Sequence, residues 1–415
     1  MVEILEKIYG MTAIGELIAN PSYIVMILLA FFLLYLGIKK EYEPLLLIPI
    51  AFGVLIANFP GGGMGVIATD GEGMVHFIKN GQEVAKNIYE MSLPEIAHDL
   101  GIMNFLYYAL IKSGLLPPII FMGVGALTDF GPMLRNLKLA IFGAGAQFGI
   151  FAVLIVASQC GFDMKEAGSL AIIGGADGPT AIFTTLKLAP DMLGPIAIAA
   201  YSYMALVPVI VPLVVKLTCS EKELKINMKE QDKLYPNKQE FKNMRVLKII
   251  FPIAVTVIVG IIVRDAVALV GMLMFGNLIK EIGSNTSRLF NAASNGIMNA
   301  ATIFLGLCVG ATMTVDAFLN IRTIGIVAGG FCAFGFSIFG GILLVKIMNL
   351  FSKKKINPLV GATGLSAVPM ASRVANDIAL KYDSRNHVLN YCMSSNVAGV
   401  IGSAVAAGIL IKILG

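Results

Sequence analysis

Apolar stretches long enough to cross a lipid bilayer recur along the whole chain. A membrane-spanning helix needs ~20 apolar residues. Soluble domains carry about a quarter charged residues, whereas this chain of 415 residues is 14% charged and 57% hydrophobic. We therefore expect an all-α polytopic membrane protein with roughly ten membrane-crossing or re-entrant segments. The clearest stretches are Tyr23–Ile38, Leu45–Asn58, Leu139–Ser158, Leu193–Leu217, Val246–Val263, Gly296–Met313, Thr323–Leu350 and Val388–Leu414.

The charged residues lie mainly in the connections between these stretches. The largest basic group lies in the polar connection Lys216–Lys248, and the positive-inside rule predicts that this connection is cytoplasmic. Lys353–Lys355 form a second basic cluster that could share that side, whereas Gly61–Asp99 carries more acid than base and suits the other face. The net charge of +5 thus arises mainly in short loops, and it does not indicate nucleic-acid binding.

Neither the N-terminal segment nor the cysteines indicate a catalytic or metal-binding site. Met1–Asn20 is amphipathic and lacks the pattern of a signal peptide. We expect an in-plane helix there, with a docking element as the alternative. The five cysteines and three histidines are scattered, so neither a zinc site nor a disulfide framework is expected.

The two halves of the chain resemble each other. Gly123–Phe130 and Cys308–Phe318 share a Gly-Ala-Asp-Phe pattern, and a Gly-rich apolar helix follows each. Each half then interrupts an apolar segment with Gly and polar residues, at Ile173–Thr180 and at Val360–Pro369. Paired interruptions mark the midplane binding site of many transporters. The alternative is that one or both interruptions are loops between ordinary helices.

These features predict five parts. They are 1–95 with the amphipathic segment, two membrane helices and an acidic loop; 96–217 with repeat 1; 218–248 as a charged, cytoplasmic loop; 249–295 with connecting membrane helices; and 296–415 with repeat 2.

Asp177 is the most informative single residue. It lies between glycines and a proline within an apolar segment, with no Lys or Arg in the motif. A carboxylate at membrane depth costs roughly 2.5–3.5 kcal/mol on insertion scales, so it normally faces a cavity and pairs with a cation. A carboxylate with backbone carbonyls suits a hard ion such as Na⁺. The alternative is a helix cap or a loop aspartate at the membrane interface.

Other polar groups lie in or near the interrupted segments. Tyr203, close to Tyr201 and Ser202, either lines a polar path or anchors at the interface. Asn357 and Ser366 belong to the second interruption, and Asn396 lies in the last apolar stretch, where amides often bond a neighbouring helix.

Two further groups have structural explanations. Arg373 and Asp377 are spaced as a helical ion pair would be. Asn291, Asn295 and Asn299 share a helix face, which predicts a seam between helices. Arg264–Asp265 predicts a tight turn, and Gly329–Gly330, Gly340–Gly341 and Gly399–Gly402 predict close packing.

The segment Ile172–Thr180 resembles the signature of the β subunits of sodium-pumping, biotin-dependent decarboxylases of oxaloacetate, methylmalonyl-CoA or glutaconyl-CoA. The likeness extends through Gly101–Phe151, Ala199–Pro208 and Asn357–Gly402, and is weaker before about residue 95. It implies a multi-pass subunit of the cell (inner) membrane with two inverted repeats, an elevator-like core domain against a scaffold, and assembly as a homotrimer.

The resemblance also implies a chemistry. The subunit would decarboxylate carboxybiotin and couple this to Na⁺ export with consumption of a proton. Asp177 would be the Na⁺- and proton-linked carboxylate, and Arg373 would lie near the carboxybiotin. Tyr203 would serve catalysis, and the ligands or close-approach positions for Na⁺ would be Asn357, Gly361, Ser366 and Asn396. The implied partners are a carboxyltransferase α subunit, a biotin carrier protein and a small membrane γ/δ subunit.

Biotin would have to arrive on another polypeptide, because Met164-Lys165 and Met228-Lys229 are each followed by glutamate and no Met-Lys-Met biotinylation tripeptide occurs. The competing function from sequence is a stand-alone sodium-coupled transporter of a small carboxylate.

Overall fold

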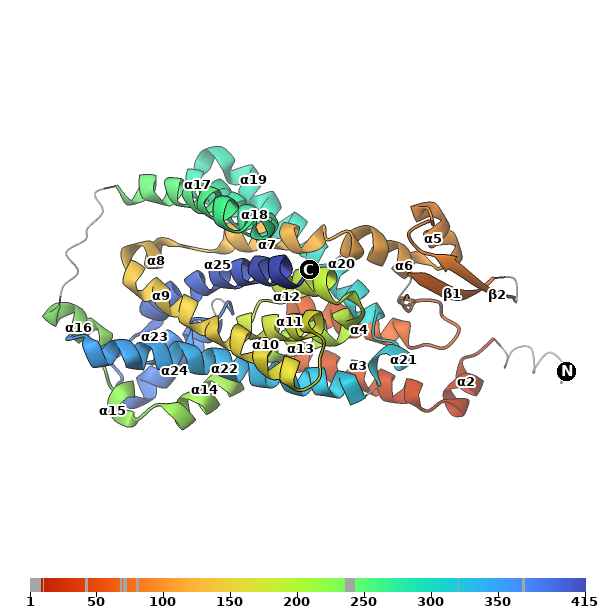
Figure 1. The fold of residues 1–415 in the computed structure, drawn as a ribbon, viewed down its shortest axis with the longest axis horizontal. Coiled ribbons are helices and arrows are strands. Elements are labelled where there is room, and N and C mark those ends of the chain that lie inside the picture. The colour runs from red at the N-terminus through yellow and green to blue at the C-terminus, as the bar shows by residue number, and fades with distance from the viewer. Residues whose placement is uncertain are drawn as a thin grey trace. The chain divides into compact units, whose positions relative to one another are not determined.

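The computed structural model describes residues 9, 11–41, 44–67, 69, 73–79, 82–235, 243–319, 321–367 and 370–415. These residues are mainly helical and form two compact units (Figure 1). Unit 1 comprises Met1–Leu116, Asp191–Pro195 and Asn299–Gly325. Unit 2 comprises Pro117–Pro190, Ile196–Met298 and Ile326–Gly415. Each unit therefore combines segments from both halves of the chain.

The expectation of a multi-span membrane protein is confirmed. Within the described residues, six helical stretches are long and apolar enough to cross a membrane, and the pair Ile102–Lys112 and Leu116–Leu127, bent by 64°, makes seven if it is one span. Pro44–Ala57 and Val207–Thr218 are apolar but shorter, so full spans number fewer than the roughly ten segments expected. The six are Ser22–Lys39, Leu137–Gln159, Met244–Ile262, Ser284–Ala311, Gly325–Phe351 and Leu389–Leu414.

Unit 1 is built on a helical hairpin that packs against a third helix. The hairpin is α3 (Ser22–Lys39) and α4 (Pro44–Ala57), and α20 (Met298–Ala311) packs on α4. Gly53 and Gly310 lie at the crossing, where a Cβ on either would overlap backbone of the other helix. Small residues permit such close approach. The unit also contains α2 (Ile14–Ala19), α6 (Ile102–Leu106), the π-helix η1 (Tyr107–Lys112), η3 (Pro190–Met192) and α21 (Val315–Phe318).

A β-hairpin in unit 1 corrects the all-α expectation. Strands β1 (Met74–Lys79) and β2 (Gln82–Asn87) pair antiparallel, from Met74 opposite Asn87 to Lys79 opposite Gln82. Val75 and Phe77 pack with α5 (Leu93–Asp99) in a small apolar core, and the amine of Lys79 lies 2.6 Å from the Asp99 carboxylate. The polar composition of this stretch suggests a loop, but its inward residues alternate as a strand requires.

Unit 2 is a bundle around the C-terminal helix α25 (Leu389–Leu414), which lies along α9 (Figure 1). A Cβ at Gly143 of α9 would be only 2.7 Å from the amide nitrogen of Gly399, so the two backbones are in close contact. The other elements of this unit are α7 (Leu116–Leu127), α8 (Gly131–Arg135), α9 (Leu137–Ala146), α10 (Phe148–Gln159), α11 (Met164–Ala171), η2 (Ile172–Gly175), α12 (Gly178–Leu188), α13 (Leu193–Ala205), α14 (Val207–Thr218), α15 (Glu221–Leu224), α16 (Met228–Leu234), α17 (Met244–Ile262), η4 (Arg264–Ala266), α18 (Val267–Ile282), η5 (Ser284–Thr286), α19 (Ser287–Asn291), η6 (Ala292–Ile297), α22 (Ile321–Phe351), α23 (Leu359–Ala362) and α24 (Met370–Tyr382).

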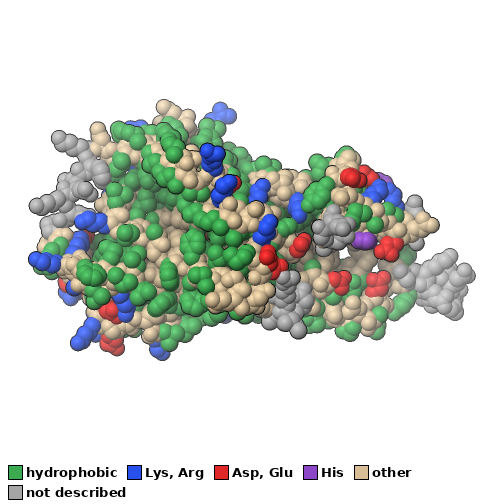
Figure 2. Space-filling view, in the orientation of Figure 1, with side chains coloured by type: hydrophobic (Ala, Val, Ile, Leu, Met, Phe, Trp, Pro, Cys, Tyr) green, Lys and Arg blue, Asp and Glu red, His purple; other side chains and the backbone are tan. Residues whose placement is uncertain are grey.

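The two basic clusters lie on one side of unit 2, as the sequence suggested. The amine of Lys354 lies 2.6 Å from the Asp232 carboxylate, and the amine of Lys346 is 3.1 Å from Glu223. Both acids belong to the polar connection 216–248. Figure 2 shows Lys and Arg side chains gathered around α15 and α16, while hydrophobic side chains cover much of the visible face of the helices.

Of two local predictions, the turn at Arg264–Asp265 is confirmed and the asparagine seam is not. Arg264–Ala266 forms a 3₁₀ turn, as expected for Arg264–Asp265. The predicted seam is wrong for this chain: Asn291, Asn295 and Asn299 are all exposed, and Ala293 and Ser294 form the buried face. The π-helical stretch Ala292–Ile297 shifts the helical register, so spacing for a regular α-helix misassigns the face.

Candidate functional site

Asp177 lies where the first interrupted segment changes from one helix to the next. A capping box with Asp163 and Glu166 begins α11, which gives way to the 3₁₀ turn η2. Ala176 then takes a left-handed conformation with φ of 55°, and Asp177 becomes the N-cap of α12. The predicted interruption is therefore confirmed, and it places a carboxylate at the junction of two short helices.

The second interruption lies against the first. Helix α23 ends at Ala362, and the next described helix, α24, begins at Met370. Between them, the backbone N–H of Ser366 donates to the carbonyl of Gly175 at 2.9 Å. Irregular backbone inside a membrane protein is tolerated where protein or a polar cavity satisfies it. Here one backbone hydrogen bond joins the two interruptions. Pro369, the end of the second interruption, lies outside the described residues.

The carboxylate of Asp177 is buried and receives three hydrogen bonds. The hydroxyls of Ser366 and Ser403 each donate to Oδ2 at 3.0 Å, and the backbone N–H of Thr180 donates to Oδ1 at 3.4 Å. Asp177 is only 8% exposed, and within the described residues it forms no ion pair with Lys, Arg or His. The cap alternative is thus correct for the backbone, but the aspartate is not an interface residue.

Besides the two interrupted segments, helix α25 also contributes side chains to the site. Asn396 and Ser403 are both fully buried and seven residues apart, so they share a helix face. The Asn396 amide donates to the carbonyl of Leu365 and accepts from the Ser372 hydroxyl at 3.3 Å. Asn396 therefore holds the backbone next to Ser366, while Ser403 contacts Asp177 itself.

Two glycine contacts keep this region compact. A Cβ at Gly178 would overlap the ring of Tyr201, and a Cβ at Gly399 would overlap the carbonyl of Gly364. Tyr201, not Tyr203, thus packs beside the aspartate. Glycine at these two positions therefore lets Tyr201 and α25 pack close to the segment that carries Asp177.

Like Asn396, the candidates Tyr203, Asn357 and Gly361 make no hydrogen bond with Asp177. The Tyr203 hydroxyl donates to the carbonyl of Val327. The Asn357 amide donates to the carbonyls of Leu224 and Ile226 at 2.9 and 3.0 Å, which holds α23 to the polar connection. Gly361 packs against Gly341 of α22, where a Cβ on either would overlap the carbonyl of the other. The expected close packing at Gly340–Gly341 and Gly399–Gly402 is confirmed.

Arg373 is exposed on α24 and has no side-chain partner among the described residues. In particular, no ion pair with Asp377 forms, so the structural explanation for the pair fails. An ion pair between two exposed side chains contributes little free energy, because water already solvates both charges. A spacing of four residues is therefore a weak predictor of an ion pair.

Sequence reasoning missed Ser403, and it did not single out Thr180, within the Ile172–Thr180 motif, or Tyr201, which it noted only beside Tyr203. Ser403 is the one with a readable signal, because it follows Asn396 by two helical turns in an otherwise apolar stretch. A buried hydroxyl at that spacing predicts a continuation of the same polar face.

The resulting donor set consists of oxygen atoms: one carboxylate, two serine hydroxyls and nearby carbonyls. Hard monovalent and divalent cations prefer such ligands. Among the described residues, no three His, Cys, Asp or Glu side chains cluster as a metal site. The arrangement can therefore hold one hard cation, or a proton, at a single buried carboxylate.

Comparison with known proteins decides the family. Residues 22–414 match the family described as the Na⁺-transporting oxaloacetate decarboxylase beta subunit. The chain belongs to this family. A β subunit of methylmalonyl-CoA decarboxylase from Propionigenium modestum is 48% identical over 95% of this chain and 96% of its own length. A β chain of oxaloacetate decarboxylase from Salmonella typhimurium is 44% identical over 94% of both chains.

The chain is thus a β subunit of a multi-subunit, Na⁺-translocating decarboxylase, held in the membrane by its helices. The match begins at residue 22, so the likeness includes α3, α4 and the β-hairpin. From sequence alone, the resemblance to the family is weaker before residue 95, because no short motif occurs there. The family match nevertheless includes this part from residue 22 on. The chain is thus similar to β subunits of both methylmalonyl-CoA and oxaloacetate decarboxylases.

Proposed function

We propose that this β subunit decarboxylates carboxybiotin presented by a partner and uses that reaction to export Na⁺. In the reaction the bond between the ureido nitrogen and the carboxylate breaks, CO₂ leaves, and a proton is taken up by that nitrogen. The observation that carries the proposal is the buried Asp177 carboxylate between Ser366 and Ser403. Such a group can exchange Na⁺ for the proton that the reaction consumes.

The electrostatics of the site support this exchange. Asp177 has no cationic side chain beside it in the described part of the chain, so a bound Na⁺ would supply the missing charge. Ser366 and Ser403 can turn their hydroxyls from donating toward the carboxylate to offering lone pairs to the ion. When the carboxylate is protonated, the formal charge that retains Na⁺ disappears and the ion is released.

The remaining candidates keep separate roles in the proposal. Asn396 positions the Leu365–Ser366 backbone, and its own amide oxygen is a potential ligand. Asn357 and Gly361 position α23, and Tyr203 anchors α13 to α22 on the path to the site. Arg373 is exposed and has no partner among the described residues, so its guanidinium can attract the anionic carboxybiotin along its path.

We also propose inverted repeats that move as an elevator-like core against a scaffold. Support comes from matched contacts, one set in each unit. In unit 1, α4 crosses α20 at Gly53 and Gly310; in unit 2, α18 crosses α7 at Gly276 and Gly125. Among the described residues, a π-helical stretch also occurs in each half, at Tyr107–Lys112 and Ala292–Ile297. In this proposal repeat 1 begins near α3 and repeat 2 begins near α17. Both starts lie earlier in the chain than the bounds 96 and 296 expected from sequence.

The proposed partners follow from the reaction. Carboxybiotin requires a carboxyltransferase α subunit to load it and a biotin carrier protein to bring it, and a small membrane γ/δ subunit and homotrimeric assembly complete the proposal. The competing stand-alone carboxylate transporter has no comparable support, because the family consists of decarboxylase β subunits.

Membranes that contain only this chain should not decarboxylate a free acid or acyl-CoA. Activity should appear when the carboxyltransferase and biotin carrier are added, or when chemically prepared carboxybiotin is supplied, because the proposal assigns the transcarboxylation step to the α subunit. Release of CO₂ measures the result. Robust decarboxylation of oxaloacetate or methylmalonyl-CoA by the purified chain alone contradicts the proposal.

Ser403→Ala should weaken activation by Na⁺ while leaving a folded protein. Loss of one hydrogen bond to a charged group corresponds to roughly a tenfold rise in the Na⁺ concentration for half-maximal decarboxylation. Ser395→Ala is the matched control, because Ser395 is buried on the same helix and its hydroxyl has no partner among the described residues. Equal Na⁺ activation in both variants argues against Ser403 as part of the ion site.

A further inference from the structure

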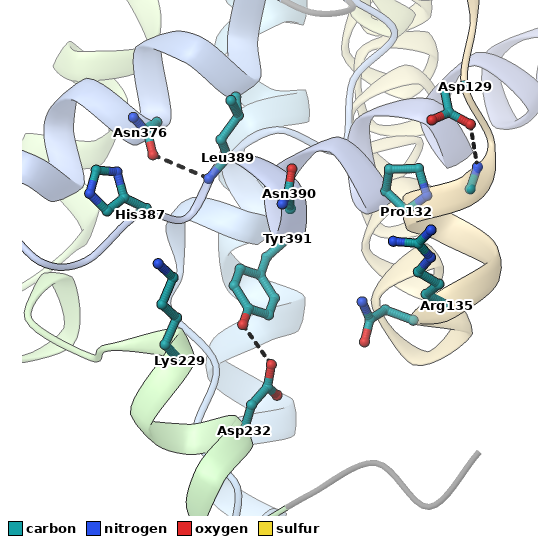
Figure 3. Close-up of a pocket in the computed structure, with 12 residues that line it drawn as sticks. Asp129, Pro132, Arg135, Lys229, Asp232, Asn376, His387, Leu389, Asn390 and Tyr391 are labelled. Atoms are coloured by element: carbon teal, nitrogen blue, oxygen red, sulfur yellow. Dashed lines mark hydrogen bonds between the residues drawn. The ribbon is translucent and has the colours of Figure 1, made fainter. Parts of the chain in front are cut away.

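A cavity of about 550 Å³ opens at the loop end of unit 2 (Figure 3). Its walls come from three separate stretches: the turn and helix 129–136, helix α16, and residues 376–391 at the junction of α24 and α25. The polar connection 216–248, for which a cytoplasmic location is expected, supplies α16. None of the residues assigned above to Asp177 or to its hydrogen bonds lines this cavity.

The carboxylates in the cavity wall are already compensated. Asp129 accepts from the Lys248 amine at 2.8 Å and from the Gly131 N–H at 2.9 Å. Partial burial raises the pKa of Asp129, but these bonds and the nearby lysine charges outweigh it and hold the pKa below the ordinary value. Asp232 accepts from the Lys354 amine and from the Tyr391 hydroxyl, each at 2.6 Å.

The cations in the wall are not compensated. Arg135 of α8 and Lys229 of α16 are exposed, and neither has a hydrogen-bond or ion-pair partner among the described residues. Figure 3 places them on opposite sides of Tyr391, with His387 above Lys229. With both aspartates neutralised by other groups, the free charge in the cavity is positive. A concave site with charge of one sign concentrates ligands of the opposite sign.

A second cavity of about 350 Å³ shares Asn136, Asp232 and Tyr391 with the first. Its other walls include the apolar side chains of Leu139, Met348 and Ile356. The two cavities together offer a cationic, amide-lined part and an aliphatic part. Their volumes lie within or near the range of small-molecule sites, about 300–1,000 Å³. The fitting ligand has a flat anionic head and an aliphatic chain, and a bare inorganic anion would leave the apolar part empty.

We infer that these two neighbouring cavities, which share wall residues, are the docking site for the N-carboxylated ureido ring of the carrier's prosthetic group, with its aliphatic arm in the apolar cavity. The inference rests on the proposed function. Arg135 would bind the carboxylate through its planar fork, and Lys229 would add a second charge. The head group is thereby held at the loop end of the fold, separately from the buried Asp177.

The test uses the full chain in its complex and supplies free N-carboxybiotin. Arg135→Ala and Lys229→Ala should each raise the KM for carboxybiotin about tenfold, the size of one exposed charge-assisted contact, and the double variant should raise it further. The Na⁺ concentration for half-maximal activity should not change. Arg288→Ala, which removes an exposed arginine outside both cavities, is the control and should keep the wild-type KM.

Competitors then identify the ligand. Biotin methyl ester should inhibit the wild type more strongly than 2-imidazolidone, which has the ring but no chain, and bicarbonate should not compete at similar concentrations. Wild-type KM values in both cavity variants, or inhibition by bicarbonate equal to that by biotin methyl ester, overturn the docking site. Failure of the proposed function is a different result, since the wild type itself would then not decarboxylate free carboxybiotin.

Discussion

Asp177→Asn should abolish both Na⁺ transport and sustained decarboxylation while the protein still folds. Asparagine is nearly isosteric and caps helices about as well as aspartate, so the start of α12 should survive. The serine hydroxyls can still donate to the side-chain oxygen. What is lost is the charge that retains Na⁺ and the proton acceptor that releases it. Uptake of radioactive sodium into vesicles with the reconstituted complex measures transport.

The matched control is Asp163→Asn, the same exchange at the exposed N-cap of α11. That variant should pump at close to the wild-type rate, because Asp163 lies outside the buried site. Asp177→Glu should retain weak activity at high Na⁺, because the charge remains but the oxygens move. Vigorous sodium uptake by Asp177→Asn would falsify the assignment of the ion site. In the wild type, apparent Na⁺ affinity should weaken as the pH falls, because protons compete for the same carboxylate.

Gly361→Ala and Gly341→Ala should each sharply reduce the yield of folded complex. A Cβ at either position would overlap the carbonyl oxygen of the other glycine, so α22 and α23 would have to separate. Overpacking of this kind typically costs about 1–3 kcal/mol, and more where only backbone could yield. Thermal unfolding in detergent and the amount of assembled complex measure the effect.

Gly335→Ala on the same helix α22 is the control. Its Cβ would be 4.0 Å from the nearest side-chain atom, of Val214, so alanine should be tolerated or should slightly stabilise the helix. If Gly361→Ala folds as well as the control but loses Na⁺ activation, Gly361 contributes to ion binding directly instead of through packing against α22.

The sequence predicted the framework of the fold because membrane constraints are strong and local. Long apolar stretches became spanning helices, and the glycine-rich interruptions became breaks at the expected residues. The strands Met74–Lys79 and Gln82–Asn87 were missed because a short polar hairpin with a six-residue apolar core has only a faint alternating pattern. The exposure of Asn291, Asn295 and Asn299 was missed because a π-helical stretch changes which positions share a face.

The candidate site was predicted in part. Asp177 and Ser366 each lie in one of the two interruptions that the sequence predicts. In the structure the Ser366 hydroxyl donates to the Asp177 carboxylate. Ser403 is 226 residues from Asp177, and only tertiary packing brings it there. The resemblance to the decarboxylase β subunits grouped Asn357 and Tyr203 with the ion site. The structure instead gives each a backbone carbonyl to bond, a need that every buried polar group has and that sequence does not distinguish from function.

The contact between Asp177 and Ser403 has a consequence for how the site forms during folding. The two residues are 226 positions apart, so Asp177 obtains this hydrogen bond only when α25 packs against α12. The Ser366 hydroxyl likewise reaches the carboxylate only when the second interruption lies against the first. The surroundings of the aspartate are therefore a product of tertiary packing, and the Ile172–Thr180 motif alone does not create them.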